Sequence, residues 1–148
     1  MVFTAQKKLF RGFTLIELLI VIAILGILAA AVLVAINPGK RTRQAQDAKR
    51  KNDVGALATE LQGFYTSPGA GSYPASLQKL VDEGYLKQMP TDPTSFANYF
   101  YVTVGASLTE VALYATLASP TGATGVWCWQ SKTAAASETL LPGNCSAI

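Results

Sequence analysis

Histidine is absent from the 148-residue sequence, which excludes imidazole acid–base catalysis and histidine-ligated metal sites. The chain also lacks a P-loop, a dinucleotide-binding fingerprint and a paired-cysteine metal motif. The carboxylates of Asp82, Glu83 and Asp92 fall where a helix end and a turn are expected, so they do not suggest a catalytic pair. These absences predict that the protein is not an enzyme and has neither catalytic residues nor a cofactor.

Charge is also scarce, with 12 Lys and Arg against 9 Asp and Glu. Three of the twelve cations, Lys7, Lys8 and Arg11, precede residue 13, and the rest of the chain is balanced, with nine basic and nine acidic side chains. Overall basicity therefore gives no argument for nucleic-acid binding. The length leaves room for one small domain beside the N-terminal region.

The most informative stretch is an apolar run of 24 residues from Phe13 to Ile36. Apart from Thr14, Glu17 and Gly26, it contains only Ala, Val, Ile, Leu and Phe. As a helix it is long enough to cross a hydrocarbon core of about 30 Å, and it predicts a membrane span. An unpaired carboxylate costs about 2.5–3.5 kcal/mol near the centre of a bilayer, and less near an end. A partner for Glu17 is therefore expected.

The twelve residues before this run form a short polar leader that ends in Gly12. Cleavage between Gly12 and Phe13 would create a positive amine one helical turn before Glu17. The alternative is a secretory signal with its cleavage site at Ala29–Ala31. The sequence disfavours it, because its hydrophobic region would be too long and would contain Glu17.

The segment Gly12–Glu17 (GFTLIE), followed by the long apolar helix, resembles the prepilins: type IV pilins and the pseudopilins of type II secretion. The resemblance implies cleavage after Gly12 by the prepilin peptidase, N-methylation of Phe13, and assembly into a helical filament. It also implies that Glu17 pairs with the Phe13 amine of a neighbouring subunit.

The same resemblance implies where the protein is found and what it contacts. Before assembly it would be a single-pass inner-membrane protein with a cytoplasmic N-terminus. Afterwards it would lie in an extracellular or envelope-spanning filament, as a homopolymer or together with other pilins. The implied partners are the prepilin peptidase and methyltransferase, an inner-membrane assembly platform and membrane lipid.

Three regions follow from these features: a leader at 1–12, a transmembrane and polymerisation helix at 13–36, and a soluble domain at 37–148 that includes the second half of the long helix. Asn37-Pro38-Gly39 predicts a kink or brief break. The basic run Lys40–Lys51 has six Lys or Arg but no interleaved aromatics. It is interpreted as a solvated helix face that touches lipid headgroups or acidic residues of adjacent subunits, and nucleic acid is disfavoured.

The soluble domain is predicted to be α+β and pilin-like, with the long helix packed against a small antiparallel sheet of about three strands. An apolar stripe at helical spacing marks the helix face that needs covering; it comprises Val54, Leu57, Leu61 and Phe64. The candidate strands are 99–104, 110–117 and 126–130, separated by turn-forming residues. The tail, residues 131–148, is predicted to be a loop.

Two cysteines, Cys128 and Cys145, predict a disulfide in an exported domain. The alternative is two unpaired thiols in a weakly oxidising envelope. Strand alternation places Cys128 opposite Trp127 and Trp129, whose expected role is core packing or subunit contact.

A second resemblance, to the major pseudopilins, covers Tyr73-Pro74, residues 77–81, residues 84–86 and Met89–Pro93. It implies that Tyr85 and Leu86 anchor a loop to the long helix. Major pseudopilins bind calcium through an acidic loop near the C-terminus. Here only Glu138 is acidic after Glu110, so no metal is predicted.

The sequence thus favours a structural subunit of a type IV pilus, because its two-cysteine C-terminal region resembles the disulfide-bounded region of many type IV pilins. Two alternatives remain. One is a major-type pseudopilin of a type II secretion system, and the other is a single-span surface-display protein that does not polymerise.

Overall fold

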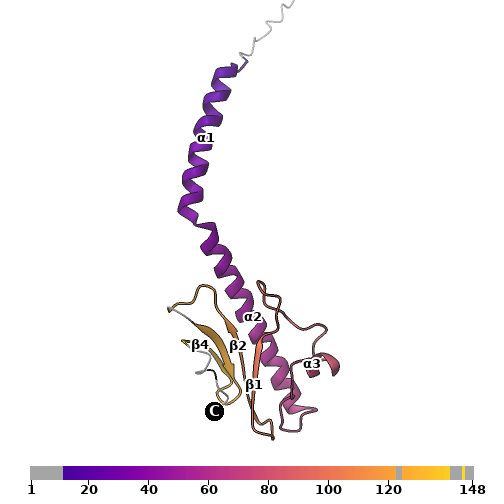
Figure 1. Cartoon of the computed structure of the whole chain (residues 1–148). Helices are drawn as coiled ribbons and strands as arrows, with labels where there is room; N and C mark the ends of the chain where they lie inside the picture. The colour runs from indigo at the N-terminus through magenta and orange to yellow at the C-terminus, as the bar shows by residue number, and fades with distance from the viewer. Residues whose placement is uncertain (1–11, 123–124, 141–144, 146–148) are drawn as a thin grey trace, which may run out of the picture. The chain divides into compact units, whose positions relative to one another are not determined.

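The computed structural model describes residues 12–122, 125–140 and 145. These residues form the helices α1 (Leu15–Ile36), α2 (Pro38–Thr66) and α3 (Gln78–Asp82) and the strands β1 (Phe100–Val104), β2 (Glu110–Thr116), β3 (Val126–Gln130) and β4 (Ala135–Thr139) (Figure 1). The chain divides into two compact units, one up to Pro38 and one from Gly39 onward. The predicted α+β, pilin-like fold class is confirmed. Of the predicted leader, only Gly12 lies within the described residues.

Helix α1 is 22 residues long and buries none of its side chains. It contains no proline and few polar residues, so nothing in its sequence interrupts the helix. At 1.5 Å per residue its length is about 33 Å, enough to cross a membrane. By length and composition it is the one membrane-span candidate among the described residues.

The predicted break after α1 is confirmed. Asn37 follows the last residue of α1 in a left-handed conformation, with φ of 47°. Asparagine tolerates this conformation and is a common residue at the end of a helix. Pro38 then takes the first position of α2, where its missing N–H has no intrahelical partner to lose.

In the unit from Gly39 onward, called the soluble unit below, α2 packs against a four-stranded antiparallel sheet in the order β1-β2-β3-β4 (Figure 1). Alternate residues of the strands face the helix, because side chains along a strand point to opposite sides of the sheet. The main core joins the helix residues Val54, Leu57, Ala58, Leu61 and Phe64 to the sheet residues Val111, Leu113, Ala115 and Trp129. The predicted apolar stripe therefore forms the helix side of the core.

Strand β4 corrects the prediction of a loop throughout the tail. Its sequence, AASET, has no alternation of apolar residues, and three of its five side chains are exposed. It is a strand because β3 supplies a pairing edge, with Cys128 opposite Ser137 and Trp129 opposite Ala136. Strand formation at such an edge depends on the neighbouring strand more than on local propensity. The sequence of β4 alone therefore did not predict a strand.

The opposite face of the sheet carries a smaller core of Ala112, Val126, Cys128 and Cys145. The two cysteines form a disulfide with their Cα atoms 5.7 Å apart. Trp129 belongs to the helix-facing core instead, so Cys128 and Trp129 point to opposite faces, as the alternation predicts. The disulfide therefore holds Cys145 against the face of the sheet that does not contact α2.

The connection from α2 to β1 is held to the helix by aromatic contacts. The rings of Phe64 and Tyr85 meet edge to face with centroids 5.8 Å apart. Leu86 also packs against the main core. The predicted anchoring of this loop by Tyr85 and Leu86 is confirmed.

Candidate functional site

The first turn of α1 brings together the residues that the sequence marks for processing and assembly. Thr14 is the N-cap residue. Its backbone N–H and its hydroxyl donate to Glu17 Oε2 at 2.9 and 2.8 Å, and the Glu17 N–H donates to Thr14 Oγ1 at 3.3 Å. This reciprocal pattern is a capping box, which satisfies two backbone donors at the helix start.

The capping box gives Glu17 a local partner that the sequence analysis missed. The signal was present, because a threonine followed three residues later by a glutamate, just before an apolar run, is the pattern of a capping box. Both bonds use Oε2, and Oε1 accepts no hydrogen bond from the described residues. One carboxylate oxygen therefore stays available, and pairing with a neighbouring subunit's amine remains a prediction.

Gly12 and Phe13 precede the cap as an exposed, non-helical segment. The Phe13 side chain is 84% exposed. A Cβ placed on Gly12 would meet no atom within 4 Å, so no packing contact with the described residues requires glycine there. A requirement for glycine at this position would have to come from an enzyme that binds the segment.

The surface of α1 is apolar on every side. Its large apolar side chains are all between 46% and 83% exposed, and a helix that is hydrophobic all round must be buried in lipid or among other helices. No other described segment of the chain covers it. The surface of α1 therefore suits burial in lipid or among other apolar helices.

In the soluble unit, Arg50 lies between two carboxylates. Its Nη1 donates to Asp47 at 2.8 Å, and its Nε and Nη2 donate to Asp92 at 2.5 and 3.1 Å. The Arg50 hydrogen bonds hold the pKa of Asp92 well below its usual range, against the opposing effect of burial. Asp47 also accepts the backbone N–H groups of Ala118 and Ser119. The cluster therefore ties α2 to both the 92–95 turn and the end of β2.

This cluster corrects part of the interpretation of the basic run. Arg50 is 5% exposed, and its neighbours are also engaged within the chain. Lys49 pairs with Asp53 at 2.5 Å, and Lys51 lies 4.6 Å from the centre of the Trp127 ring. Arg50 is therefore not part of a solvated face, and Lys49 and Lys51, although partly exposed, are paired with carboxylates of their own chain.

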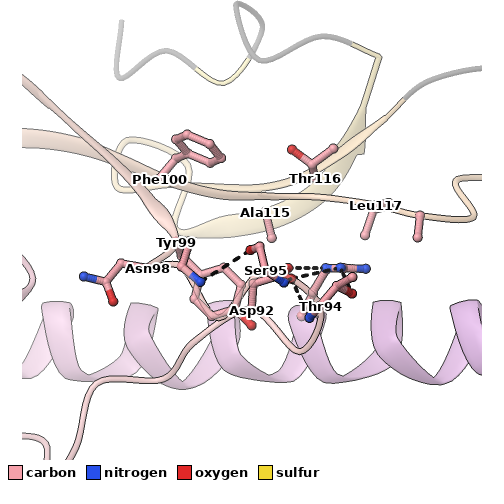
Figure 2. A pocket seen from close by; sticks show the side chains of 12 residues that line it. Asp92, Thr94, Ser95, Asn98, Tyr99, Phe100, Ala115, Thr116 and Leu117 are labelled. Atoms are coloured by element: carbon pink, nitrogen blue, oxygen red, sulfur yellow. Dashed lines mark hydrogen bonds and ion pairs between the residues drawn. The ribbon is translucent and has the colours of Figure 1, made fainter.

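A cavity of about 350 Å³ lies beside this cluster, between the 92–100 segment and the end of β2 (Figure 2). Ala115 and Leu117 point toward α2, whereas Phe100 and Thr116 point away from it. The charged residues of the lining, Arg50 and Asp92, are bound to each other. The described residues include no group of three or more metal-ligating side chains. The absence of catalytic residues and of a metal stays a prediction.

The comparisons with known proteins agree with the N-terminal geometry. Residues 7–33 match the family model of the prokaryotic N-terminal methylation motif. Type II secretion system core protein G of Pseudomonas aeruginosa is 35% identical over 104 residues, covering 60% of this chain and 70% of the relative. The proteins of that name from Aeromonas hydrophila and Dickeya chrysanthemi are 34% and 31% identical and cover 60% and 64% of this chain and 70% and 69% of the relatives. No solved structure is significantly similar.

The similarity extends well beyond the methylation motif into the soluble unit, because the alignments cover 60–64% of this chain whereas the motif ends at residue 33. The structure agrees with this similarity, because it has an exposed apolar helix near the N-terminus and an α+β unit in which a long helix packs on an antiparallel sheet. The chain therefore belongs to the family of filament-forming pilins and pseudopilins.

Proposed function

We propose that this chain is the major-type pseudopilin of a type II secretion system, a structural subunit without catalytic activity or cofactor. The observation that carries the proposal is the similarity to type II secretion system core protein G over 104 residues at 35% identity. The methylation motif alone would not distinguish pilins from pseudopilins, because it ends at residue 33. The remaining similarity lies in the soluble unit and favours the secretion system.

The type IV pilus, which the sequence analysis favours, is less well supported. Its main argument is the disulfide between Cys128 and Cys145 near the C-terminus. Any exported domain can form a disulfide in an oxidising compartment. The disulfide therefore indicates the compartment, but it does not distinguish a type IV pilus from a secretion pseudopilus. Similarity along the chain carries more information than one covalent link.

In the proposed pathway the chain enters the inner membrane through α1 with its N-terminus in the cytoplasm. The prepilin peptidase cuts between Gly12 and Phe13, and the new amine of Phe13 is methylated. The exposure of both residues supports access by an enzyme. The soluble unit then lies on the far side of the membrane, where its cysteines can be oxidised.

Assembly follows from the surface of α1. An assembly platform in the membrane would move subunits out of lipid, and their helices would then bury one another's apolar side chains within a filament, alone or with other pilins. The free oxygen of Glu17 would accept the Phe13 amine of a neighbouring subunit. Such a charge-assisted bond is strongest where water is excluded.

Deletion of the gene in its source organism tests the proposal. We expect proteins that are normally released into the medium to accumulate in the periplasm, and the wild-type gene to restore their release. The variant Gly12→Val should fail to restore it. Gly55→Ala should succeed, because a Cβ on this glycine of α2 meets no atom within 4 Å. Normal release combined with a loss of surface pili would contradict the proposal and favour the type IV pilus.

A further inference from the structure

The basic run after the membrane helix separates into two groups. Lys49, Arg50 and Lys51 all have carboxylate partners in the soluble unit. Arg41 and Arg43 are exposed and form no ion pair with any described residue. Arg41 and Arg43 therefore carry positive charge that no described residue of the chain neutralises through an ion pair.

Asp47, four residues after Arg43, is the nearest acidic residue, but its carboxylate is already bound by Arg50 and by the backbone N–H groups of Ala118 and Ser119. Between Glu17 and Asp47 the chain contains no aspartate or glutamate. Neither arginine therefore has an acidic residue within the two helical turns that precede it, and side chains on a helix pair three or four positions apart. Within the part of the chain that the structure describes, Arg41 and Arg43 therefore have no carboxylate partner.

Distance along the chain indicates which anions those are. Arg41 and Arg43 lie five and seven residues after Ile36, the end of the apolar helix, which corresponds to about 8 and 11 Å at helical rise. The headgroup layer adds about 5–8 Å to each side of the hydrocarbon core. Long cationic side chains can bend back toward that layer, so both guanidinium groups can reach lipid phosphates.

We propose that Arg41 and Arg43 bind the phosphates of anionic phospholipids in the leaflet that faces the soluble unit. Guanidinium groups suit this role because their paired donors match a phosphate and because they stay charged at any physiological pH. A shared helix face is not required, because headgroups surround the whole circumference of a helix where it leaves the membrane. The binding sets the depth of α1 in the bilayer.

Acidic residues of an adjacent subunit are the competing partner. The lipid is favoured because the subunit meets it before any filament forms, and because this stretch lies at headgroup level whichever way the soluble unit is turned. Removal of the leader also strips Lys7, Lys8 and Arg11 from the other side of the membrane. The remaining juxtamembrane cations then all lie on the side of the soluble unit, and extraction into a filament must break their lipid contacts.

This inference rests on the proposed function, since it takes the chain to be inserted in a membrane. The test uses the full-length processed protein, reconstituted at low density in vesicles of phosphatidylcholine and phosphatidylglycerol. Spin-labelled lipids report how strongly each headgroup associates with the protein. We expect wild-type protein to prefer phosphatidylglycerol, and Arg41→Gln with Arg43→Gln to lower that preference by up to about fivefold per arginine. Lys87→Gln with Lys132→Gln removes the same charge from exposed sites elsewhere and should leave the preference unchanged.

Three outcomes would overturn the inference. Equal preference in wild type and the arginine variant would show that these residues bind no lipid. Loss of the preference on adding inorganic phosphate at constant ionic strength would identify a site for free phosphate. An unchanged lipid preference with reduced cross-linking between subunits at high density would assign the arginines to neighbouring carboxylates. Carbonate extraction separates the two proposals, because a chain that fails to insert contradicts the proposed function itself.

Discussion

Arg50 and Asp92 lie 42 residues apart in the sequence and are joined by two hydrogen bonds, Nε to Oδ2 at 2.5 Å and Nη2 to Oδ1 at 3.1 Å. Such a two-point contact fixes the relative orientation of both groups as well as their distance. Asp92 in turn accepts the backbone N–H groups of Thr94 and Ser95. The guanidinium group of Arg50 therefore fixes the turn before β1 against α2.

Replacing Arg50 with methionine should destabilise the soluble unit by about 3 kcal/mol, because it leaves Asp47 and Asp92 without a cation in a largely buried site. The matched control is Lys49→Met, which removes a half-exposed pair within one helix and should cost less than about 0.5 kcal/mol. Urea unfolding of the processed protein, followed by near-ultraviolet circular dichroism, gives both values. Equal losses in the two variants would contradict the assigned role of Arg50.

The same ion pair predicts a dependence of stability on pH. The hydrogen bonds from Arg50 lower the pKa of Asp92 in the folded state, whereas an unfolded aspartate titrates near pH 3.9. A lowered pKa in the folded state stabilises the fold above the unfolded value, and that contribution is lost as the pH falls below about 4. In Asp92→Asn, the free energy of unfolding should therefore fall less steeply than in wild type as the pH drops below about 4, as urea unfolding at a series of pH values would show. An equally steep fall in the variant would show that other carboxylates cause it.

The disulfide predicts a separable contribution to stability. Cys128 and Cys145 are 17 residues apart, and a link that closes such a loop is worth about 3 kcal/mol in the chain-entropy treatment. Cys145→Ala should lose about that much while keeping the circular dichroism of Trp129, which lies on the opposite face of the sheet. Reductant should weaken the wild type equally and leave the variant unaffected. An insensitive wild type would argue that the link is not formed in the native protein.

Processing can be checked by mass alone. The protein extracted from membranes should begin at a methylated Phe13, without residues 1–12. Gly12→Val should retain the leader, because a branched side chain would clash with a peptidase site built for glycine, while no described residue crowds that position. An N-terminus near Ala31 would instead identify a secretory signal.

The parts that the sequence predicted well are those with a strong local pattern. The apolar run gives α1, the stripe at Val54 and Leu57 gives the core-facing side of α2, and Asn37-Pro38 gives the break between the helices. The alternation of Cys128 and Trp129 correctly assigned them to opposite faces of the sheet.

The missed features depend on contacts between distant residues. β4 forms through its pairing with β3. Nothing in the sequence around Arg50 indicates that this residue is buried, so the whole basic run was predicted to be exposed to solvent. The capping box, in contrast, could have been predicted, because Thr14 and Glu17 have the required spacing and residue types. The position of Glu17 in an apolar run favoured a partner outside the chain, and the local partner Thr14 was missed.

The central claim is that subunits polymerise through α1 with the Glu17 charge bound by a neighbour. Glu17→Gln tests it cleanly, because glutamine can keep the capping bonds to Thr14 while removing the charge. Thr14→Val is the matched control, since it removes the hydroxyl from the capping box and leaves the carboxylate. The measurement is the yield of filaments sheared from cells that overproduce each processed variant, relative to wild type. We expect Glu17→Gln to form almost none and Thr14→Val to form near wild-type amounts. Abundant filaments from Glu17→Gln would contradict the claim and leave Glu17 with only its capping role.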